Sequence, residues 1–565
     1  MNKFQSDILK ILPQKWNNEK IVWEELLEIP TKSSHGDYAF ACFRLAKLFK
    51  TQPQKLAEDI CKKLKKTPLI SKIEREGAYI NFYVNREELI SFVLPKILEE
   101  KEKYGSAKGG QNKTVIVEYS SPNIAKPFHF GHLRSTIIGQ SLCNIYNFLG
   151  YKTIAINHLG DWGTQFGKII YAFKEWGNEK DYKNSGVDYL NSLYVQFHQK
   201  AKENPDIEDH ARLWFSKCEE GDEEALKLWH EFKEKSLASF EKIYHRLGVK
   251  FDEILGESFY IDKIPDVLKE LEKKKLLSKS EGALIVDLSK YDMPPCLLKK
   301  KDGSTLYATR DLACAIYRHK KYKFDQMVYV VAQDQTLHFK QIIKVLELMG
   351  HEWATSIVHL PFGLVGFKEG KMSTREGRVI LLEDALDQAK QRVLKNIAEK
   401  NPDLENKEEV SEQVGKGAII FSDVSQKMIK NVTFDWDDIL SFEGETGPYL
   451  QYSFARASSI LRKSTEKQKI NIDFSVLKEE HEFQLVKTLF YFPDFLELTI
   501  KHQEPSILAH YLLDVAKTFN RFYLNHKVIV PDLKLHQARL SLVAATCQTL
   551  GNGLRLLNIE TPYEM

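Results

Sequence analysis

Groups suited to phosphate chemistry lie close together in residues 126–132 (KPFHFGH). The imidazoles of His129 and His132 and the ammonium group of Lys126 can donate hydrogen bonds to the oxygens of a triphosphate. Gly131 lets a flat or charged ligand approach the backbone closely. Phosphoryl and adenylyl transfer depend on oriented positive groups, so this segment is a candidate nucleotide site. An isolated H-x-G-H pattern is more often a pair of ordinary surface histidines, so its surroundings must decide.

A second candidate segment covers residues 370–377 (GKMSTREG). It is bounded by glycines and carries two cations, Lys371 and Arg375. By itself such a segment is typical of a solvated loop. Its combination with an H-x-G-H segment that follows a strand in the same α/β domain is more specific than either motif alone.

A strand, a loop and a helix must position the histidines. Residues 114–119 (TVIVEY) predict a buried strand, residues 120–132 a loop, and residues 133–149 a helix with an apolar stripe. Residues 153–157 (TIAIN) predict a second strand, and strands joined through a helix imply a parallel sheet. Ligands of such sheets bind at the carboxyl ends of the strands, where this loop lies.

Composition limits the classes of protein to consider. A chain of 565 residues with 43% hydrophobic and 28% charged residues indicates a globular protein of two to four domains. A net charge of +3 gives no whole-chain argument for nucleic-acid binding, and local lysine clusters are more typical of solvated surfaces. The sequence shows neither a signal-peptide core nor an apolar run of about 18 residues. We therefore expect a cytoplasmic protein with no membrane partner.

The seven cysteines are scattered and never spaced as C-x-x-C. This pattern argues against a disulfide framework and against a structural zinc site. We expect buried free thiols and no zinc.

Changes of pattern along the chain predict three domains. The first mixes helical and strand-like segments and covers residues 1–105, ending in a polar, glycine-containing stretch. The second covers residues 106–404 and includes a helical, charged insertion near residues 170–260. The third, residues 405–565, has a helical pattern almost throughout.

The two candidate segments together resemble the class I aminoacyl-tRNA synthetases, in which both hold ATP and stabilise the transition state that forms the adenylate. Further segments are similar to the arginyl-tRNA synthetases in particular. They are residues 35–39 (HGDYA), 117–139 (VEYSSPNIAKPFHFGHLRSTIIG), 157–167 (NHLGDWGTQFG), 307–311 (YATRD), 441–452 (SFEGETGPYLQY) and 559–565 (IETPYEM). The resemblance runs from about residue 30 to the last residue.

The resemblance implies a Rossmann-like α/β catalytic domain with a parallel sheet, between an N-terminal α+β domain and a C-terminal all-helical domain. It implies that L-arginine is activated with ATP to arginyl-adenylate and that the arginyl group is transferred to the 3′ terminal ribose of tRNA. It also implies that tRNA is needed for efficient activation. Mg²⁺ would accompany ATP, held mainly by phosphates and water.

The resemblance carries residue roles onto this sequence. The catalytic and ATP-binding residues would be Lys126, His129, Gly131, His132, Lys371, Met372 and Ser373. The arginine-binding residues would be Glu118, Ser120, Asn123, His132, Tyr307, Asp311 and Gln335. The chemistry agrees, because a guanidinium carries five donors in one plane and its recognition needs carboxylate oxygens and neutral acceptors in fixed geometry. An alternative for Asp311 is a carboxylate that merely stabilises a helix N-terminus.

One departure from the class pattern concerns the expected second lysine of K-M-S-K-S. Thr374 stands at that position and Arg375 follows it. In this family a lysine just upstream of H-x-G-H is thought to take the missing role, which here would be Lys126. Lys371 is retained, and Arg375 could either contribute or face outward.

The resemblance assigns tRNA contacts to three places. Tyr449 and Tyr452, one turn apart on a predicted helix, would contact the anticodon together with the terminal Met565. Exposed aromatic rings stack on unpaired bases, although both tyrosines could instead pack in a helical core. Asn81 is the candidate for the tRNA elbow. We expect a monomer.

Two alternatives remain open at this stage. The chain could be another enzyme with an H-x-G-H nucleotide site, such as a different class I synthetase or a small adenylyl transferase, and Asp311 with Tyr307 argues against this. It could also be a non-catalytic tRNA-binding paralogue, and the intact Lys126, His129 and His132 argue against that.

Overall fold

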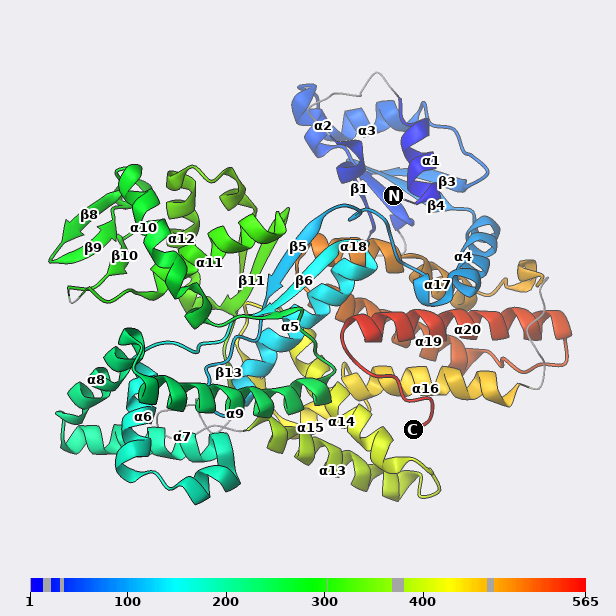
Figure 1. Cartoon of the computed structure of the whole chain (residues 1–565). Coiled ribbons are helices and arrows are strands. Elements are labelled where there is room, and N and C mark those ends of the chain that lie inside the picture. The colour runs from blue at the N-terminus through cyan, green and yellow to red at the C-terminus, as the bar shows by residue number, and fades with distance from the viewer. Residues whose placement is uncertain (1, 14–21, 31–34, 302, 368–380, 465–471) are drawn as a thin grey trace. The chain divides into compact units, whose positions relative to one another are not determined.

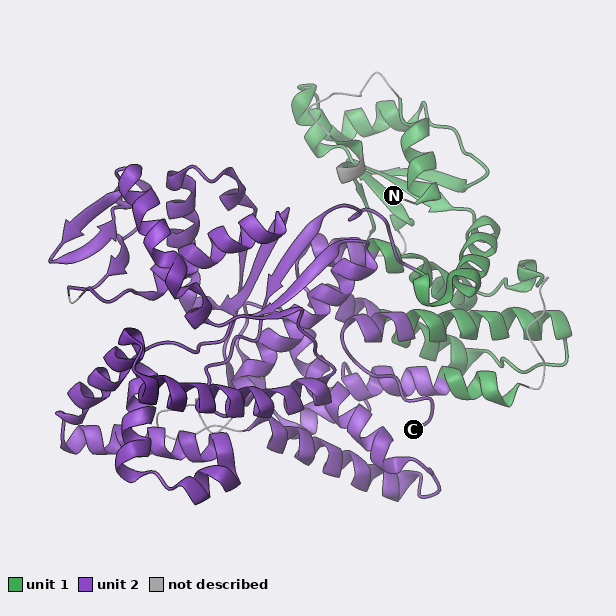
Figure 2. Ribbon diagram, viewed as in Figure 1, with its two compact units in different colours: residues 1–104, 457–494, 514–550 green, residues 105–456, 495–513, 551–565 purple. Residues whose placement is uncertain are grey.

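The computed structural model describes residues 2–13, 22–30, 35–301, 303–367, 381–464 and 472–565. The chain forms two compact units (Figure 2). Unit 1 contains residues 1–104, 457–494 and 514–550, and unit 2 contains residues 105–456, 495–513 and 551–565. Throughout the described ranges, every helix is too short or too polar to cross a membrane.

Unit 1 is built on a four-stranded antiparallel sheet in the order β1-β2-β4-β3 (Figure 1). One helix begins at Pro53, whose fixed φ angle suits a first helical turn, and one strand ends at Val84. The elements up to α4 are α1 (Lys3–Ile11), β1 (Leu27–Glu28), β2 (Tyr38–Ala41), α2 (Phe43–Leu48), α3 (Pro53–Cys61), β3 (Ile70–Glu76), β4 (Tyr79–Val84) and α4 (Arg86–Glu100).

Unit 2 contains a five-stranded sheet in which every pair is parallel, in the order β12-β11-β5-β6-β7. The parallel pairing predicted from the first strand–helix–strand unit is therefore confirmed. The strands and their connecting helices are β5 (Thr114–Glu118), α5 (Phe130–Phe148), β6 (Lys152–Asn157), β7 (Glu253–Ile254), α10 (Ile264–Lys273), α11 (Tyr307–Tyr322), β11 (Gln326–Ala332), α12 (Thr336–Met349) and β12 (Ile357–Phe362).

The apolar sequence of β5 follows from its position. It pairs with β6 on one side and β11 on the other, so four of its five residues are buried. One large core cluster packs the sheet against α10, α11 and α12 and includes Ile116, Ile156, Leu312 and Val345. This core holds the strands in place, and several of the predicted site residues come directly after them, at the carboxyl edge of the sheet.

The insertion between β6 and β7 consists of helices, as expected for residues near 170–260. They are α6 (Thr164–Trp176), α7 (Glu179–Glu203, kinked at Gly186), α8 (Ile207–Glu220) and α9 (Glu223–Leu247). A small antiparallel sheet that the sequence did not reveal lies between β7 and β11 in the chain, formed by β8 (Leu277–Ser280), β9 (Ala283–Val286) and β10 (Cys296–Lys299). In the sequences of these short, partly exposed strands, apolar and polar residues do not alternate with a period of two.

The C-terminal part is mainly helical, with one exception to the expectation. Strand β14 (Val432–Phe434) interrupts the helices because it pairs in parallel with β13 (Val365–Phe367). The helices are α13 (Leu382–Lys400), α14 (Lys407–Val424), α15 (Trp436–Ile439), α16 (Gly447–Lys463), α17 (Glu480–Phe490), α18 (Phe492–His502), α19 (Ser506–Asn525) and α20 (Leu533–Leu556).

The start of α5 differs from the prediction. The sequence placed residues 120–132 in a loop, but α5 begins at Phe130 and its N-cap is His129. The N-cap side chain accepts a backbone hydrogen bond, which is what serine or aspartate does at most helix starts. Histidine is uncommon in this role, so the signal for a helix start was missed.

Candidate active site

The first turn of α5 organises the two histidines. His129 Nδ1 accepts a hydrogen bond from the Gly131 N–H at 3.1 Å, and His132 Nδ1 accepts one from the His129 N–H at 3.2 Å. The two rings stack with centroids 3.7 Å apart and planes inclined by 25°. A neutral imidazole whose Nδ1 accepts carries its proton on Nε2, so each ring presents an N–H donor at its other edge.

Electrostatics keep both rings neutral. Burial, with a smaller contribution from the Lys126 ammonium, lowers the pKa of His129 to about 4. Burial, and then the charges of His129 and Lys126, holds the pKa of His132 well below its usual value. The Lys126 Nζ lies 4.8 Å from the centroid of the Tyr194 ring. At this site the positive charge therefore comes from Lys126 and the neutral donors from the imidazoles.

The loop that leads from β5 to α5 has an unusual backbone. Ser120 and Ala125 have φ angles of 72° and 60°, although neither is glycine. Side chains from other elements hold them, because the Ser120 N–H donates to Ser135 Oγ at 2.9 Å and the Ala125 N–H donates to Ser236 Oγ at 2.8 Å. Such conformations cost about 1–3 kcal/mol each and persist where the surroundings enforce them, often at functional sites.

The Ser120 hydroxyl belongs to a buried polar network. It lies 2.8 Å from the Tyr244 hydroxyl and accepts a hydrogen bond from Thr136 Oγ1 at 2.9 Å. Asn157 Nδ2 also donates to the Tyr244 hydroxyl, at 3.0 Å. These bonds fix the loop against α9 and the end of β6, so Ser120 has a positioning role in addition to the predicted ligand contact.

Asn123, in the same loop, is exposed and forms a β-bridge with Gly160. Its Oδ1 accepts a hydrogen bond from Gln165 Nε2 at 3.3 Å. A Cβ at position 160 would lie 2.0 Å from this Oδ1, so any other residue there would displace the Asn123 side chain. The segment after β6 thereby sets the orientation of Asn123.

Asp161 anchors that segment to the insertion. Its buried carboxylate lies 2.6 Å from Lys233 Nζ on α9 and accepts hydrogen bonds from the Ser258 N–H and hydroxyl at 2.9 and 2.7 Å. A Cβ at Gly256 would lie 2.2 Å from the carboxylate. The insertion and the parallel sheet are thus joined beside the candidate site.

Asp311 lies one turn after Tyr307 on α11. Its Oδ2 is 2.6 Å from His338 Nε2, and His338 is on α12. The Tyr307 side chain is 60% exposed, and the exposed Gln335 lies one turn before His338. The structure therefore brings Asp311 next to the start of α12, where Gln335 lies, and His338 is a partner that the sequence did not identify.

A second carboxylate, Glu257, lies near the same region. Burial raises the pKa of Glu257 to about 8, although the neighbouring Arg310 acts in the opposite direction. Arg310 Nε lies 3.0 Å from Glu257 Oε2, and its guanidinium lies 4.9 Å from the centroid of the Tyr307 ring. The charge of Asp311 also contributes to the raised pKa, so these groups form one coupled cluster.

Glu118, predicted as an arginine ligand, forms an ion pair with Arg318 of α11, and both side chains are buried. The ligand atoms of Glu118, His158 and Cys314 lie within 4.8 Å of one another. This donor set does not suit a metal ion, because Arg318 already supplies the positive charge next to Glu118 and burial raises the pKa of Cys314 to about 12.

The predicted residues Lys371, Met372 and Ser373 lie outside the described residues. The strand β13 ends at Phe367, just before this segment, and α13 begins at Leu382, after it. Leu381 forms an antiparallel bridge with His129, so the chain returns to the first turn of α5.

The predicted tRNA contacts occupy different environments. Tyr452 on α16 is 39% exposed, with the Arg456 guanidinium 4.7 Å from its ring centroid, and Tyr449 is half-buried. The Met565 carbonyl accepts a hydrogen bond from Asn401 Nδ2 at 3.4 Å. Asn81, on β4 of unit 1, is only 3% exposed and donates to Glu76 Oε2 at 3.4 Å. Because Asn81 is almost fully buried, contact with a ligand would require local rearrangement around it.

Several charged residues of the site were missed from the sequence. Asp161 lies inside the motif at residues 157–167, but nothing in that motif indicates that its carboxylate is paired with Lys233. Arg318 follows Asp311 by seven positions, two helical turns, so a common face of α11 was the available signal. His338 and Glu257 carried no such signal, because their partners come from other elements.

Comparisons with known proteins agree with this geometry. Residues 93–436 match the family described as tRNA synthetases class I (R), catalytic domain, residues 450–565 the DALR anticodon binding domain, and residues 2–84 the arginyl tRNA synthetase N terminal domain. An arginine–tRNA ligase of Clostridioides difficile is 48% identical over 560 residues, covering 99% of each chain, and one of Clostridium perfringens is 51% identical over 545 residues, covering 96% of each. A solved arginyl-tRNA synthetase of Thermus thermophilus has a TM-score of 0.83 and 27% identity, covering 95% of this chain and 96% of its own. The Rossmann-like fold, the sequence motifs and these matches together lead to one conclusion: the chain belongs to the arginyl-tRNA synthetases.

Proposed function

We propose that this chain ligates L-arginine to its tRNA in two steps, at the carboxyl edge of the parallel sheet in unit 2. The observation that carries the assignment is the stacked, neutral pair His129 and His132 next to Lys126, with Asp311 on the helix whose Arg318 contacts the end of β5. The first group suits ATP, and Asp311 suits a guanidinium.

In the first step the arginine carboxylate attacks the α-phosphorus of ATP, and pyrophosphate leaves. Negative charge then increases on the phosphate oxygens. Lys126 would supply the compensating charge, and the Nε2–H groups of His129 and His132 would supply oriented neutral donors. Gly131, Lys371, Met372 and Ser373 would complete the ATP site. No side-chain nucleophile is needed.

Arginine selection would depend on Asp311, with Tyr307 and Gln335 as further contacts to the side chain. His338 would orient the Asp311 carboxylate through the 2.6 Å contact between them. Glu118, Ser120, Asn123 and His132 would surround the backbone end of arginine. Because Arg318 already pairs with Glu118, the Glu118 carboxylate would offer a fixed hydrogen-bond acceptor to the ligand rather than an unpaired negative charge.

In the second step a hydroxyl of the 3′ terminal ribose attacks the arginyl carbonyl, and AMP leaves. Tyr449, Tyr452 and Met565 would contact the anticodon, where aromatic rings stack on unpaired bases. Asn81 would contact the tRNA elbow.

Mg²⁺ would reach the site with ATP, through phosphate oxygens and water. The donors described around the histidines are nitrogen groups, which suit the phosphates rather than the metal ion. We further propose that the protein works in the cytoplasm as a monomer without zinc.

The deciding experiment is ATP–pyrophosphate exchange across a panel of amino acids with tRNA present, followed by arginylation of tRNA. We expect exchange with L-arginine and stable charging of tRNA. Exchange with a different amino acid and none with arginine would replace this assignment with another adenylate-forming enzyme. Binding of tRNA without charging would make the chain a non-catalytic paralogue.

A further inference from the structure

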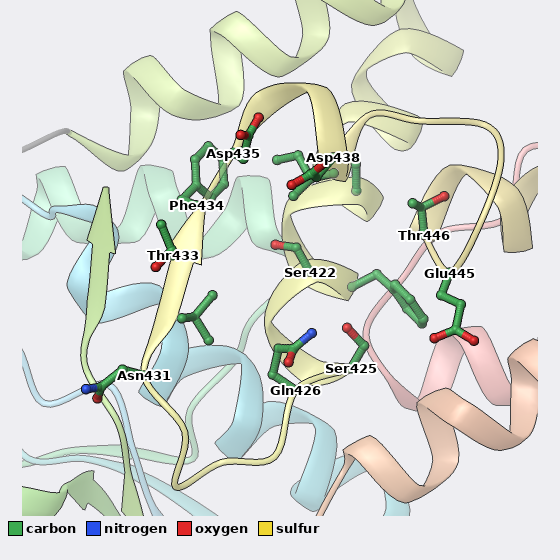
Figure 3. A pocket seen from close by; sticks show the side chains of 15 residues that line it. Ser422, Ser425, Gln426, Asn431, Thr433, Phe434, Asp435, Asp438, Glu445 and Thr446 are labelled. Atoms are coloured by element: carbon green, nitrogen blue, oxygen red, sulfur yellow. The ribbon is translucent and has the colours of Figure 1, made fainter. Parts of the chain in front are cut away.

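A polar cavity of about 290 Å³ lies in unit 2, between the end of α14, β14, α15 and the start of α16 (Figure 3). The residues that line it all lie between Ala418 and Gly447, and none of them has a proposed role in the reaction. The volume is near the lower limit of about 300 Å³ for small-molecule sites. It has room for roughly ten or more water molecules, so a bare ion would not fill it.

The wall of the cavity carries negative charge. Three of the lining residues are carboxylates, Asp435, Asp438 and Glu445, and no lysine, arginine or histidine is among the lining residues. The Asp435 side chain caps α15 by accepting a hydrogen bond from the Asp437 N–H. Asp438 is exposed and forms no ion pair with any residue that the structure describes. Like charges repel, so this wall favours a cationic ligand and disfavours phosphate groups.

One buried hydroxyl in the wall lacks a hydrogen-bond partner. Ser425, the C-cap of α14, is only 7% exposed, and its hydroxyl points into the cavity (Figure 3). In the part of the chain that is described, no group forms a hydrogen bond with this hydroxyl. Buried polar groups nearly always have a partner. The hydroxyl of Ser425 therefore indicates that a hydrogen-bonding group of a ligand belongs inside the cavity.

The groups around Ser425 narrow the chemistry of that ligand. Ser422, one turn earlier on α14, donates its hydroxyl hydrogen to the Ile419 carbonyl oxygen at 2.8 Å, so its oxygen remains available as an acceptor. The rings of Phe421 and Phe434 contribute apolar wall. Acceptors beside apolar rings suit a ligand in which ammonium groups, which only donate, alternate with methylene groups.

A divalent metal ion fits these groups less well. Such ions need about six oxygen ligands converging on one point. Within the described ranges, the carboxylates of this wall do not form a group of three side chains whose ligand atoms converge. An extended organic cation needs no such convergence, because its charges are spread along a chain.

We propose that this cavity is a binding site for an aliphatic polyamine, with an ammonium group held by Asp438 and Ser425 and methylene groups against Phe421 and Phe434. The site is separate from the proposed reaction centre but shares a packing element with it. The Phe434 ring packs edge-on against Phe130, the first residue of α5, with centroids 4.6 Å apart. The inference does not depend on the proposed activity, because it concerns binding alone.

The test is isothermal titration of the full-length protein with spermidine, without ATP, arginine or tRNA. The control ligand is the uncharged diol of the same chain length. We expect saturable binding of spermidine at one site, weakened by added salt, and no binding of the diol. Amide hydrogen exchange with and without spermidine locates the site, and exchange should slow within residues 418–447.

Three variants test the assigned contacts. Asp438→Asn removes the charge and should raise the Kd for spermidine about tenfold, and Ser425→Ala removes the buried hydroxyl and should raise it about fivefold. Asp437→Asn is the matched control, because Asp437 is an exposed carboxylate on the same short helix that does not line the cavity. Its Kd should stay within about twofold of the wild type. Melting temperatures confirm that each variant is folded.

Several results would overturn the proposal. If spermidine shows no saturable binding, the cavity holds only water. Equal weakening in Asp438→Asn and Asp437→Asn would indicate attraction to surface charge in general. Binding of the diol with similar affinity would remove the role of charge, and slowed exchange outside residues 418–447 alone would place the ligand elsewhere. A normal Kd in both Asp438→Asn and Ser425→Ala would remove the assigned contacts.

Discussion

Replacing Asp311 by asparagine isolates the charge that would recognise the arginine side chain. The substitution keeps the shape of the side chain and one acceptor oxygen, and it removes the negative charge. In the structure this carboxylate is 22% exposed and lies 2.6 Å from His338 Nε2, so it is partly shielded from water and held in one orientation. A guanidinium bound by Asp311 would therefore meet a carboxylate that is already held in place.

The size of the effect follows from these contacts. Truncating one partner of a buried, hydrogen-bonded charge pair costs about 2–5 kcal/mol. Partial exposure and the retained acceptor place Asp311→Asn in the lower half of that range, at about 3 kcal/mol. Since about 1.4 kcal/mol corresponds to a factor of ten, KM for L-arginine should rise roughly 150-fold.

The assay is pyrophosphate exchange with tRNA present, in which L-arginine is compared with L-citrulline, its uncharged analogue. The wild type should strongly prefer arginine, and Asp311→Asn should narrow that preference while KM for ATP stays nearly constant. Asp266→Asn, on the exposed first turn of α10, is the matched control and should behave as the wild type. An unchanged KM for arginine in a folded Asp311→Asn protein would refute the assigned role.

Three further outcomes test the rest of the site. Lys126→Ala should slow adenylate formation about 100-fold in single-turnover measurements, and Lys371→Ala should slow it less. A larger effect of Lys371→Ala would assign the role of the absent second lysine of K-M-S-K-S to residues 370–377 instead of Lys126. The folded-state pKa of about 4 for His129 lies below its unfolded value of about 6.5, so the unfolded chain takes up the proton first. The contribution of this group to the free energy of unfolding is therefore complete above pH 6.5 and decreases as the pH falls towards 4. Urea titrations at several pH values should show that the free energy of unfolding falls less steeply with pH for His129→Asn than for the wild type. The kcat/KM for ATP should show no inflection near pH 6.5. Tyr452→Ala should raise KM for tRNA about tenfold through lost stacking and leave KM for ATP unchanged, whereas an unaltered tRNA titration would place this ring outside the interface.

The sequence predicted the parts of the fold that have a local pattern. The strands at residues 114–119 and 153–157 and the helix between them follow from apolar runs and periodicity, and their parallel pairing follows from that order. The start of α5 was placed three residues late, because the first turn is capped by an imidazole. The small sheet β8–β10 was missed because its short strands lack alternation.

The candidate site could be predicted from the sequence to a similar extent. Motifs pointed to His129, His132 and Asp311, whose proposed roles depend on their own side chains. The partners of Asp311 and Asp161 could not be predicted, because His338 and Lys233 come from elements whose proximity depends on the folded sheet and insertion. Arg318, the partner of Glu118, had only the weak signal of sharing a face of α11 with Asp311. Local patterns also say nothing of charge state, so neither the neutral histidines nor the raised pKa of Glu257 could be anticipated.

The dual use of the His129 side chain has a consequence for how substitutions there are interpreted. Its Nδ1 begins α5 by capping the Gly131 N–H, while its Nε2 edge is the one left for a ligand. If the ring binds the nucleotide as proposed, helix initiation and nucleotide binding are thermodynamically linked through one side chain, and a ligand held by Nε2 should slow amide hydrogen exchange at Gly131. Alanine at this position would lose a cap of about 1 kcal/mol as well as a ligand contact, so its effect would exceed the contact alone. Asparagine can cap without offering the imidazole edge, and the difference between the two variants measures how much of the loss belongs to folding.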